Sequence, residues 1–235
     1  MLSVDSLRLH RGGKAVLHGI SLQVAPGEVT ALLGANGAGK SSTVMAIAGA
    51  LPVSGGRIEV EGQALQGQRP EHVRALGVAV VPEGHRVLGD LSVLDNLRAA
   101  ATLLPQAEVQ AGIARVLAIF PELEPKLALS GRSLSGGQKQ MVCIAQALIG
   151  KPRYLAIDEL SLGLSPLIVK RLAEVVQRVA RDGVGVLLIE QFTTLALAIS
   201  TRAYVLERGR MAFDGASDDL RQRPEILHSS YLAGD

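Results

Sequence analysis

The chain has 235 residues, enough for one large domain or two closely packed lobes with a substantial buried core. Its 24 basic and 22 acidic residues leave a formal net charge of +2 at pH 7, which argues against a nucleic-acid-binding protein because such proteins usually carry a strong basic surface. The single cysteine, Cys143, excludes an internal disulfide and fits a reducing compartment; inside the apolar run 141–145, it is predicted to be a buried apolar side chain.

The N-terminal part of the chain is predicted to be mainly β-structure. Apolar residues that alternate or run together, with glycine and proline turns between them, indicate strands at 3–9, 16–24, 29–33, 57–61 and 77–81. The first residues lack the apolar core of a secretory signal, and no uncharged run reaches the ~20 residues that span a membrane. We therefore expect no export by that route and, at most, a peripheral membrane role through partners.

A glycine-rich segment follows the third predicted strand. Residues 34–42 read GANGAGKSS, which matches G-x-x-x-x-G-K-[ST], and a helical stretch begins near Lys40. Strand, glycine loop and helix together form the context of a P-loop, in which backbone N–H groups and the helix N-terminus bind phosphate. Lys40 would reach the β- and γ-phosphates of a nucleotide and Ser41 would ligate Mg²⁺; the alternative is an ordinary strand-to-helix turn. The predicted nucleotide-binding residues are Gly34, Ala35, Asn36, Gly37, Ala38, Gly39, Lys40, Ser41 and Ser42.

A predicted helical segment interrupts this α/β pattern at residues 84–150. Ser92 is a predicted N-cap for a helix at 92–101, a second helix is predicted at 107–120, and no strand pattern returns before residue 151. We therefore predict one domain over residues 1–235. Its core is formed by 1–83 and 151–235, and 84–150 is a helical insertion.

The C-terminal part alternates strands and helices again. Pro166 opens a helix with a single predicted buried face, formed by Ile168, Leu172, Val175, Val176 and Val179. The other expected elements are strands at 153–158 and 184–189, a hairpin of 203–207 with 211–213, and a polar helical tail at 218–235.

Acidic residues close two of the predicted strands. Asp158 and Glu159 end the apolar strand 153–158, which resembles a Walker B strand: Asp158 would hold the Mg²⁺ shell, and Glu159 would orient or deprotonate an attacking water. Glu83 follows the strand 77–81, at the edge of an α/β sheet where ligands gather. The alternative for the adjacent acids is a solvated strand end.

The pentapeptide LSGGQ at 134–138 is a second candidate anion site. Ser135, Gly136, Gly137 and Gln138 open a predicted helix whose first N–H groups are available to phosphate oxygens, although a flexible helix start is the alternative. With this motif, lying between the P-loop and the Asp158-Glu159 pair, the whole chain resembles the ATP-binding-cassette (ABC) ATPases.

The resemblance implies a fold and an assembly. The expected fold is α/β, a P-loop NTPase (RecA-like) core with an N-terminal antiparallel β-subdomain and an inserted α-helical subdomain. LSGGQ would bind the γ-phosphate of ATP held on the P-loop of a second ABC ATPase subunit, identical or different, so that two ATP molecules with Mg²⁺ are sandwiched. The other implied partners are two transmembrane permease subunits and an extracytoplasmic substrate-binding protein, but no nucleic acid. The chain would sit peripherally on the cytoplasmic face of the bacterial inner membrane.

Finer details resemble the ATPase subunits of branched-chain amino-acid importers. They are VPEGHR at 81–86, DELSLGLSP at 158–166 and IEQ at 189–191. By this resemblance, residues 161–163 form the D-loop that contacts the partner's phosphate loop. Glu83 takes the place of a glutamine that senses Mg²⁺ and the attacking water, and the segment up to Asp95 docks a permease helix.

Three positions depart from the general family pattern. Gln191 replaces a histidine; its amide can donate to a γ-phosphate but cannot relay a proton. His10 and Arg11 stand where an aromatic side chain stacks on adenine, and either plane could also stack. Leu160 replaces a proline. The three substitutions indicate either neutral drift or an asymmetric dimer in which a different ATPase supplies the more competent residues.

The sequence therefore predicts an ATP-hydrolysing subunit that energises import of a branched-chain or related amino acid. Alternatives within the family are an importer of urea, amides or another small nutrient. Outside transport, the alternatives are a cassette protein acting on nucleic acid or ribosomes, which usually carries two cassettes or basic extensions, and a regulatory module that holds ATP without turnover.

Overall fold

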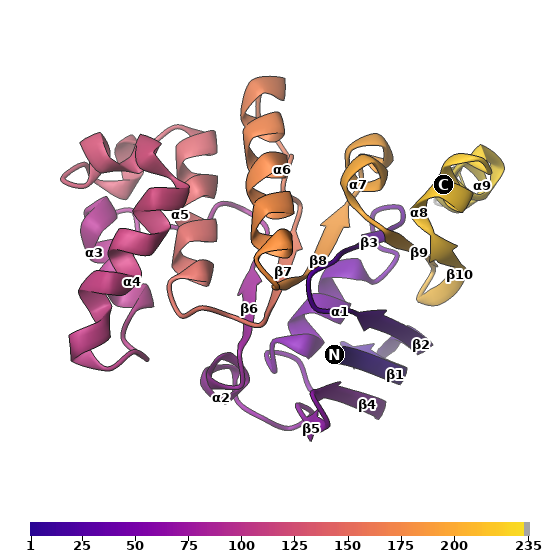
Figure 1. Ribbon diagram of the computed structural model, residues 1–235. Helices are drawn as coiled ribbons and strands as arrows, with labels where there is room; N and C mark the ends of the chain where they lie inside the picture. Colours follow the sequence, from indigo (N-terminus) through magenta and orange to yellow (C-terminus); the bar gives the residue numbers. More distant parts are fainter. Residues whose placement is uncertain (233–235) are drawn as a thin grey trace.

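Two β-sheets form the centre of the molecule (Figure 1). The computed structural model describes residues 1–232, so 233–235 of the predicted tail 218–235 lie outside the described residues. The smaller sheet is antiparallel, with the order β2-β1-β4-β5. Its strands are β1 (Leu2–Arg11), β2 (Lys14–Val24), β4 (Gly55–Val60) and β5 (Gln63–Ala64).

The larger sheet has six strands in the order β10-β9-β3-β8-β7-β6. All neighbouring pairs are parallel except the β9–β10 hairpin. The strands are β3 (Val29–Leu33), β6 (Val78–Val81), β7 (Tyr154–Asp158), β8 (Gly185–Glu190), β9 (Arg202–Glu207) and β10 (Arg210–Ala216). Because parallel strands end at one edge, the segments that follow β3, β6, β7 and β8 come together there.

Helices cover both faces of the larger sheet and form a separate group at one end of the molecule. The α-helices are α1 (Lys40–Ile47), α2 (Pro70–Ala75), α3 (Val93–Ala100), α4 (Gln106–Ile119), α5 (Gly136–Leu148), α6 (Pro166–Arg181), α7 (Thr193–Ile199), α8 (Ser217–Arg221) and α9 (Pro224–Leu232). Two 3₁₀ segments are η1 (Pro121–Lys126) and η2 (Gly131–Ser133).

Each face of the larger sheet is buried under its own apolar cluster. Along β3, Ala31 and Leu33 belong to the cluster that includes α5 and α6, whereas Leu32 belongs to the cluster that includes α1 and the smaller sheet. Figure 1 shows α1 between the two sheets. Burial on both faces explains why β3 is a continuous apolar run rather than an alternating one.

The predicted strands and longer helices are confirmed, with ends that differ by a few residues. The sequence analysis did not predict α2, α7 or β5, which are too short to establish a periodic pattern.

Cys143 is buried, as predicted, and its burial raises the pKa of the thiol to about 11. The predicted buried face of α6 is confirmed except at Ile168, which is only partly buried because it lies in the first turn, against the start of α5. The tail is two helices, because Pro224 starts a new one.

The helices α3, α4 and α5 lie between β6 and β7 in the chain and pack on one another. In Figure 1 they form a group at the far end from the smaller sheet. We propose that residues 84–150 are a helical subdomain of one domain spanning 1–235, whose core is formed by 1–83 and 151–235.

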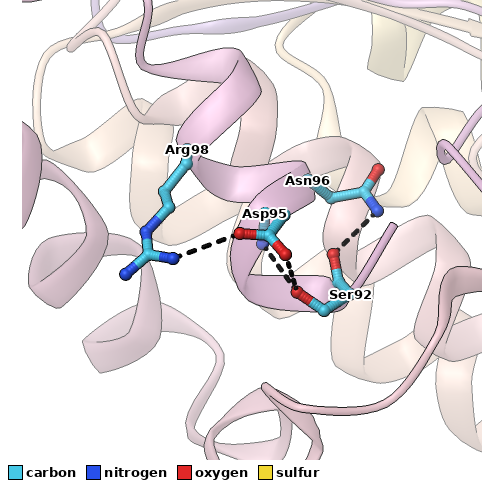
Figure 2. A network of polar contacts seen from close by, with 4 residues as sticks. All are labelled: Ser92, Asp95, Asn96 and Arg98. Atoms are coloured by element: carbon cyan, nitrogen blue, oxygen red, sulfur yellow. Dashed lines mark hydrogen bonds and ion pairs between the residues drawn. The ribbon is translucent and has the colours of Figure 1, made fainter. Parts of the chain in front are cut away.

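A polar network fixes the loop between β6 and α3 (Figure 2). Ser92 is the N-cap of α3: its Oγ accepts the Asp95 N–H at 3.0 Å, and Asp95 also pairs with Arg98 at 3.1 Å. Asn96 is fully buried, and its Nδ2 donates to the Ser92 carbonyl at 3.0 Å. Its Oδ1 accepts the Leu88 N–H at 2.8 Å, while Nδ2 donates to the Leu88 carbonyl at 2.9 Å. Asn96 therefore fastens the loop that carries Glu83 to the helical subdomain.

Candidate nucleotide-binding and hydrolysis site

A cavity of about 680 Å³ lies at the edge where the parallel strands end. Its walls come from the ends of β1 and β2 and from the segments after β3, β6, β7 and β8. The lining residues are Arg11, Val16, Asn36, Gly37, Gly39, Lys40, Ser41, Ser42, Glu83, Glu159, Leu162 and Gln191. The fold thus gathers most of the predicted phosphate loop, two of the three predicted acids (Glu83 and Glu159) and Gln191 around one space, whereas Asp158 does not line it.

Glycines shape the phosphate loop at positions where a side chain cannot fit. Gly34 has a φ of 146°, and a Cβ there would overlap the Leu206 carbonyl oxygen. Gly39 has a φ of 109°, and a Cβ there would lie 2.7 Å from Leu17 Cδ2. No side chain caps the start of α1, so its first N–H groups are available to a ligand. A loop of this form can bind the oxygens of a polyphosphate.

The Lys40 side chain folds back over this loop. Its Nζ donates to the Gly34 carbonyl at 2.8 Å and to the Ala35 carbonyl at 3.0 Å, and the residue is only 6% exposed. Burial lowers the pKa of the ammonium, while the negative charges of Glu159 and Asp158 oppose that shift. A cation is therefore held in place beside the position where a phosphate would contact the loop.

Asp158 ends β7 next to Ser41. Burial raises the pKa of the Asp158 carboxyl, the charges of Glu159 and Glu83 raise it further, and a hydrogen bond from Ser41 lowers it. Its Oδ1 is buried with no hydrogen-bond partner in the described part of the chain. Such an oxygen is suited to a cation that prefers oxygen ligands, so Asp158 and Ser41 fit the donor set of Mg²⁺.

Mg²⁺ sites in nucleotide enzymes commonly use one or two protein oxygens and complete the shell with phosphate and water. Within residues 1–232, no group of three or more His, Cys, Asp or Glu side chains is arranged to hold a metal ion. Asp158 and Ser41 supply a carboxylate and a hydroxyl oxygen of this kind.

Glu159 and Gln191 contact each other directly. Glu159 has a φ of 56°, a conformation that costs a non-glycine residue free energy, and its N–H donates to the Ile189 carbonyl at 3.0 Å. Its Oε1 accepts a hydrogen bond from Gln191 Nε2 at 2.5 Å, while Oε2 is buried with no partner among the described residues. The carboxylate is thus oriented by the amide and keeps one oxygen available for a proton.

The two predicted adenine contacts lie in different places. Arg11 lines the cavity, but His10 does not: its Nδ1 contacts Ser54 Oγ at 2.9 Å on the exposed side of β1. Arg11 is therefore the predicted adenine contact that faces this cavity, and the contact of either residue with a base stays a prediction.

The LSGGQ segment lies outside this cavity. Ser135 Oγ accepts the Gln138 N–H at 3.3 Å, and Gln138 Oε1 accepts the Ser135 N–H at 3.0 Å, which forms a capping box at the start of α5. Gly137 packs so tightly that a Cβ would lie 2.8 Å from Ile168 Cγ2, and a Cβ on Gly136 would lie 3.4 Å from Leu164 Cδ2. None of residues 134–138 lines the cavity at this chain's own phosphate loop, and their predicted binding to a partner's nucleotide stays a prediction.

A protein-family model described as ABC transporter matches residues 17–161, more than half of the chain. The chain belongs to the ABC transporter family.

Curated relatives of this ABC chain match it over nearly its whole length. A high-affinity branched-chain amino acid transport ATP-binding protein, BraG of Pseudomonas aeruginosa, is 38% identical over 234 residues, covering 100% of both chains. A probable branched-chain amino acid transport ATP-binding protein, LivF of Archaeoglobus fulgidus, is 33% identical and covers 94% of this chain and 95% of its own. The lipopolysaccharide export system ATP-binding protein LptB of Escherichia coli K12 is 30% identical and covers 100% and 98%.

A solved ATP-binding subunit of an ABC transporter superposes with a TM-score of 0.85 at 31% identity, covering 99% of this chain and 98% of that one. The predicted α/β P-loop NTPase fold is therefore confirmed, and the chain is an ATP-binding, ATP-hydrolysing subunit of an ABC transporter. Subunits of this kind work with membrane permeases. None of the helices in residues 1–232 combines the length and apolar character needed to cross a bilayer.

Two residues of this ABC subunit gain an explanation from the structure. Leu160 is fully buried in the apolar cluster beneath α5 and α6, so an apolar side chain suits the position. Glu190, which the sequence analysis did not select as a site residue, is 1% exposed and accepts hydrogen bonds from the Ser161 N–H and Ser161 Oγ, both at 2.9 Å. The signal that could have revealed it is an acid at the end of an otherwise apolar buried strand.

Proposed function

We propose that this chain energises an ABC importer for branched-chain or related amino acids. The observation that supports hydrolysis is that Lys40, Ser41 and Glu159 line one cavity, with the buried Asp158 carboxylate beside Ser41. The substrate class is supported by the names of BraG and LivF, both related along almost the whole chain. LptB, whose name refers to lipopolysaccharide export, is also related, so import and substrate are part of the proposal and need a direct test.

In the proposed reaction, the N–H groups of 34–42 and Lys40 bind the phosphates of ATP. Ser41 and Asp158 would hold Mg²⁺, with Glu83 in its shell, and the ion would offset phosphate charge when bound. Glu159 accepts the proton of a water whose oxygen attacks the γ-phosphorus. The bond from that phosphorus to the β–γ bridging oxygen breaks, giving ADP and phosphate.

Gln191 has a defined part in this proposal. It is neutral near pH 7, so it cannot relay a proton as a histidine could, but its amide can orient the Glu159 carboxylate. Arg11 would contact the base. A second ATPase subunit, identical or different, would place its nucleotide against Ser135, Gly136, Gly137 and Gln138 of this chain.

The proposed transporter also contains two permease chains and an extracytoplasmic binding protein, with this subunit on the cytoplasmic face. A hollow of about 260 Å³ beside the β6–α3 loop is the proposed docking place for a permease helix. Pro82, Arg86 and Leu88 line it, and Leu88 is 52% exposed. The capping network around Asn96 would then join this surface to the segment that carries Glu83.

The proposal is tested with the complex purified through this subunit and reconstituted in vesicles. Lys40→Ala should abolish both ATP hydrolysis and ATP-dependent uptake, whereas Lys170→Ala, an exposed residue of α6, should leave both unchanged. Glu159→Gln should retain ATP binding and trap an ATP-bound dimer without turnover, which separates a transport motor from a module that only holds ATP.

The substrate is tested in the same vesicles with radiolabelled leucine, isoleucine and valine, with urea and acetamide as competitors. Uptake of a branched-chain amino acid supports the proposal. Uptake of urea or an amide alone, or an export system among the co-purified chains, would contradict it.

A further inference from the structure

Glu190 is a buried carboxylate without a nearby ion-pair partner. It is 1% exposed, and in the described part of the chain no Lys, Arg or His side chain lies within ion-pair distance of it. Burying a charge in this way is costly unless hydrogen bonds replace the lost water. The replacements come from Ser161, whose N–H and hydroxyl each donate to a different carboxylate oxygen at 2.9 Å.

Burial raises the pKa of the Glu190 carboxyl, and the hydrogen bonds from Ser161 lower it. Glu190 is the last residue of β8, so its bonds to Ser161 join the end of β8 to the loop after β7. The segment that follows β8 begins at the next residue, Gln191.

Both segments line the nucleotide cavity. Leu162, the neighbour of Ser161, forms part of its wall, as does Gln191, the neighbour of Glu190. Gln191 in turn donates to Glu159 at 2.5 Å. Glu190 does not line the cavity itself but lies behind the wall that holds the proposed base and the residue that orients it.

We propose that Glu190 is a positioning residue for ATP hydrolysis, fixing the loop 161–163 and Gln191 in one arrangement so that the Gln191 amide stays on the Glu159 carboxylate. This inference rests on the proposed roles of Glu159 and Gln191. Both oxygens of the carboxylate accept hydrogen bonds from Ser161, one from its N–H and one from its hydroxyl. A glutamine replaces one acceptor by an NH₂ group, so it removes the charge and keeps both contacts only if the bond to the Ser161 hydroxyl is reversed.

The test uses the full chain purified with its permease partners, and measures kcat and KM for ATP, nucleotide binding and Tm. Ser161→Ala removes one donor to Glu190 and is expected to lower kcat about tenfold with less than a twofold change in KM, because a hydrogen bond to a charged group is lost in the arrangement needed for the transition state. Glu190→Gln should act in the same direction. Ser161→Thr keeps the hydroxyl and should restore kcat.

Ser200→Ala is the matched control. Ser200 is 7% exposed, against 8% for Ser161, and its hydroxyl contacts Ser217 Oγ at 2.7 Å; Ser200 does not line the cavity. It should lower Tm by a similar amount but leave kcat unchanged. If Ser161→Ala and Glu190→Gln lower only Tm, as the control does, the positioning role is refuted.

A double variant adds a second criterion. If Glu190 and Ser161 act together, Glu190→Gln with Ser161→Ala should be no slower than the slower single variant, whereas effects that multiply would contradict the inference. Failure of the proposed function can be recognised independently of this inference. If Glu159 is not the base, Glu159→Gln will still hydrolyse ATP, whatever the result for the Glu190 and Ser161 variants.

Discussion

Asn96→Ala should release the loop between β6 and α3 and destabilise the protein. The amide of Asn96 makes three hydrogen bonds of 3.0 Å or less, to Leu88 N–H, the Leu88 carbonyl and the Ser92 carbonyl. At about 1 kcal/mol of net stability for each bond, the expected loss is about 3 kcal/mol. For a domain of this length that corresponds to a fall in Tm of roughly 6–12 °C.

The assay is thermal unfolding followed by circular dichroism, with urea titrations to obtain the free energy. Ser92→Ala is a milder variant for comparison, because it removes only the Ser92 Oγ that accepts the Asp95 N–H and leaves the Asn96 amide in place. It should lower the free energy of unfolding by about 1 kcal/mol. Asn96→Ala should also reduce coupling between ATP hydrolysis and uptake in vesicles, since the loop carries Glu83. A fall in Tm no larger than that of Ser92→Ala would refute the reasoning from the buried amide.

Three further predictions follow from local geometry. Gly137→Ala should cost about 1–3 kcal/mol, because its Cβ would lie 2.8 Å from Ile168 Cγ2; adding Ile168→Ala should recover most of that loss in Tm, and no recovery would contradict the clash. Glu159→Gly should be about 1 kcal/mol more stable than Glu159→Ala in urea titrations, since φ is 56° there, and equal stability would contradict the strain; neither variant should hydrolyse ATP. Burial raises the pKa of Glu190 above its ordinary value of 4.5, so the folded protein binds this proton more tightly than the unfolded chain does. The stabilisation that comes from this tighter proton binding is fully present below pH 4.5, and it is lost as the pH rises through the folded-state pKa of Glu190. Glu190→Gln should therefore show a flatter stability curve from pH 4.5 to 7, and a curve parallel to that of the natural protein would contradict the assignment.

The sequence predicted the groups that local pattern determines. The phosphate loop could be found because its spacing and its flanking strand and helix are contiguous, and Asp158 could be found because it closes an apolar strand. The start of α3 was predicted from Ser92, since N-capping depends on residues within one turn.

Contacts between separate strand ends could not be predicted in the same way. Gln191 and Glu159 meet because β7 and β8 are neighbours, and strand order is a property of the whole chain. For the same reason, the bonds between Glu190 and Ser161 were not expected. The side on which Arg11 lies, and on which His10 does not, depends on the register of β1, which composition does not reveal.

The close packing at Gly136 and Gly137 has a consequence for motion. A Cβ on Gly136 would lie 3.4 Å from Leu164 Cδ2, and one on Gly137 would lie 2.8 Å from Ile168 Cγ2, so the first turn of α5 has no room for a side chain between itself and the start of α6. A tilt of α5 must push the start of α6 with it, or open a void beside Ile168. A rotation of the helical subdomain would therefore also move the loop after β7, through side-chain packing and without a bound nucleotide.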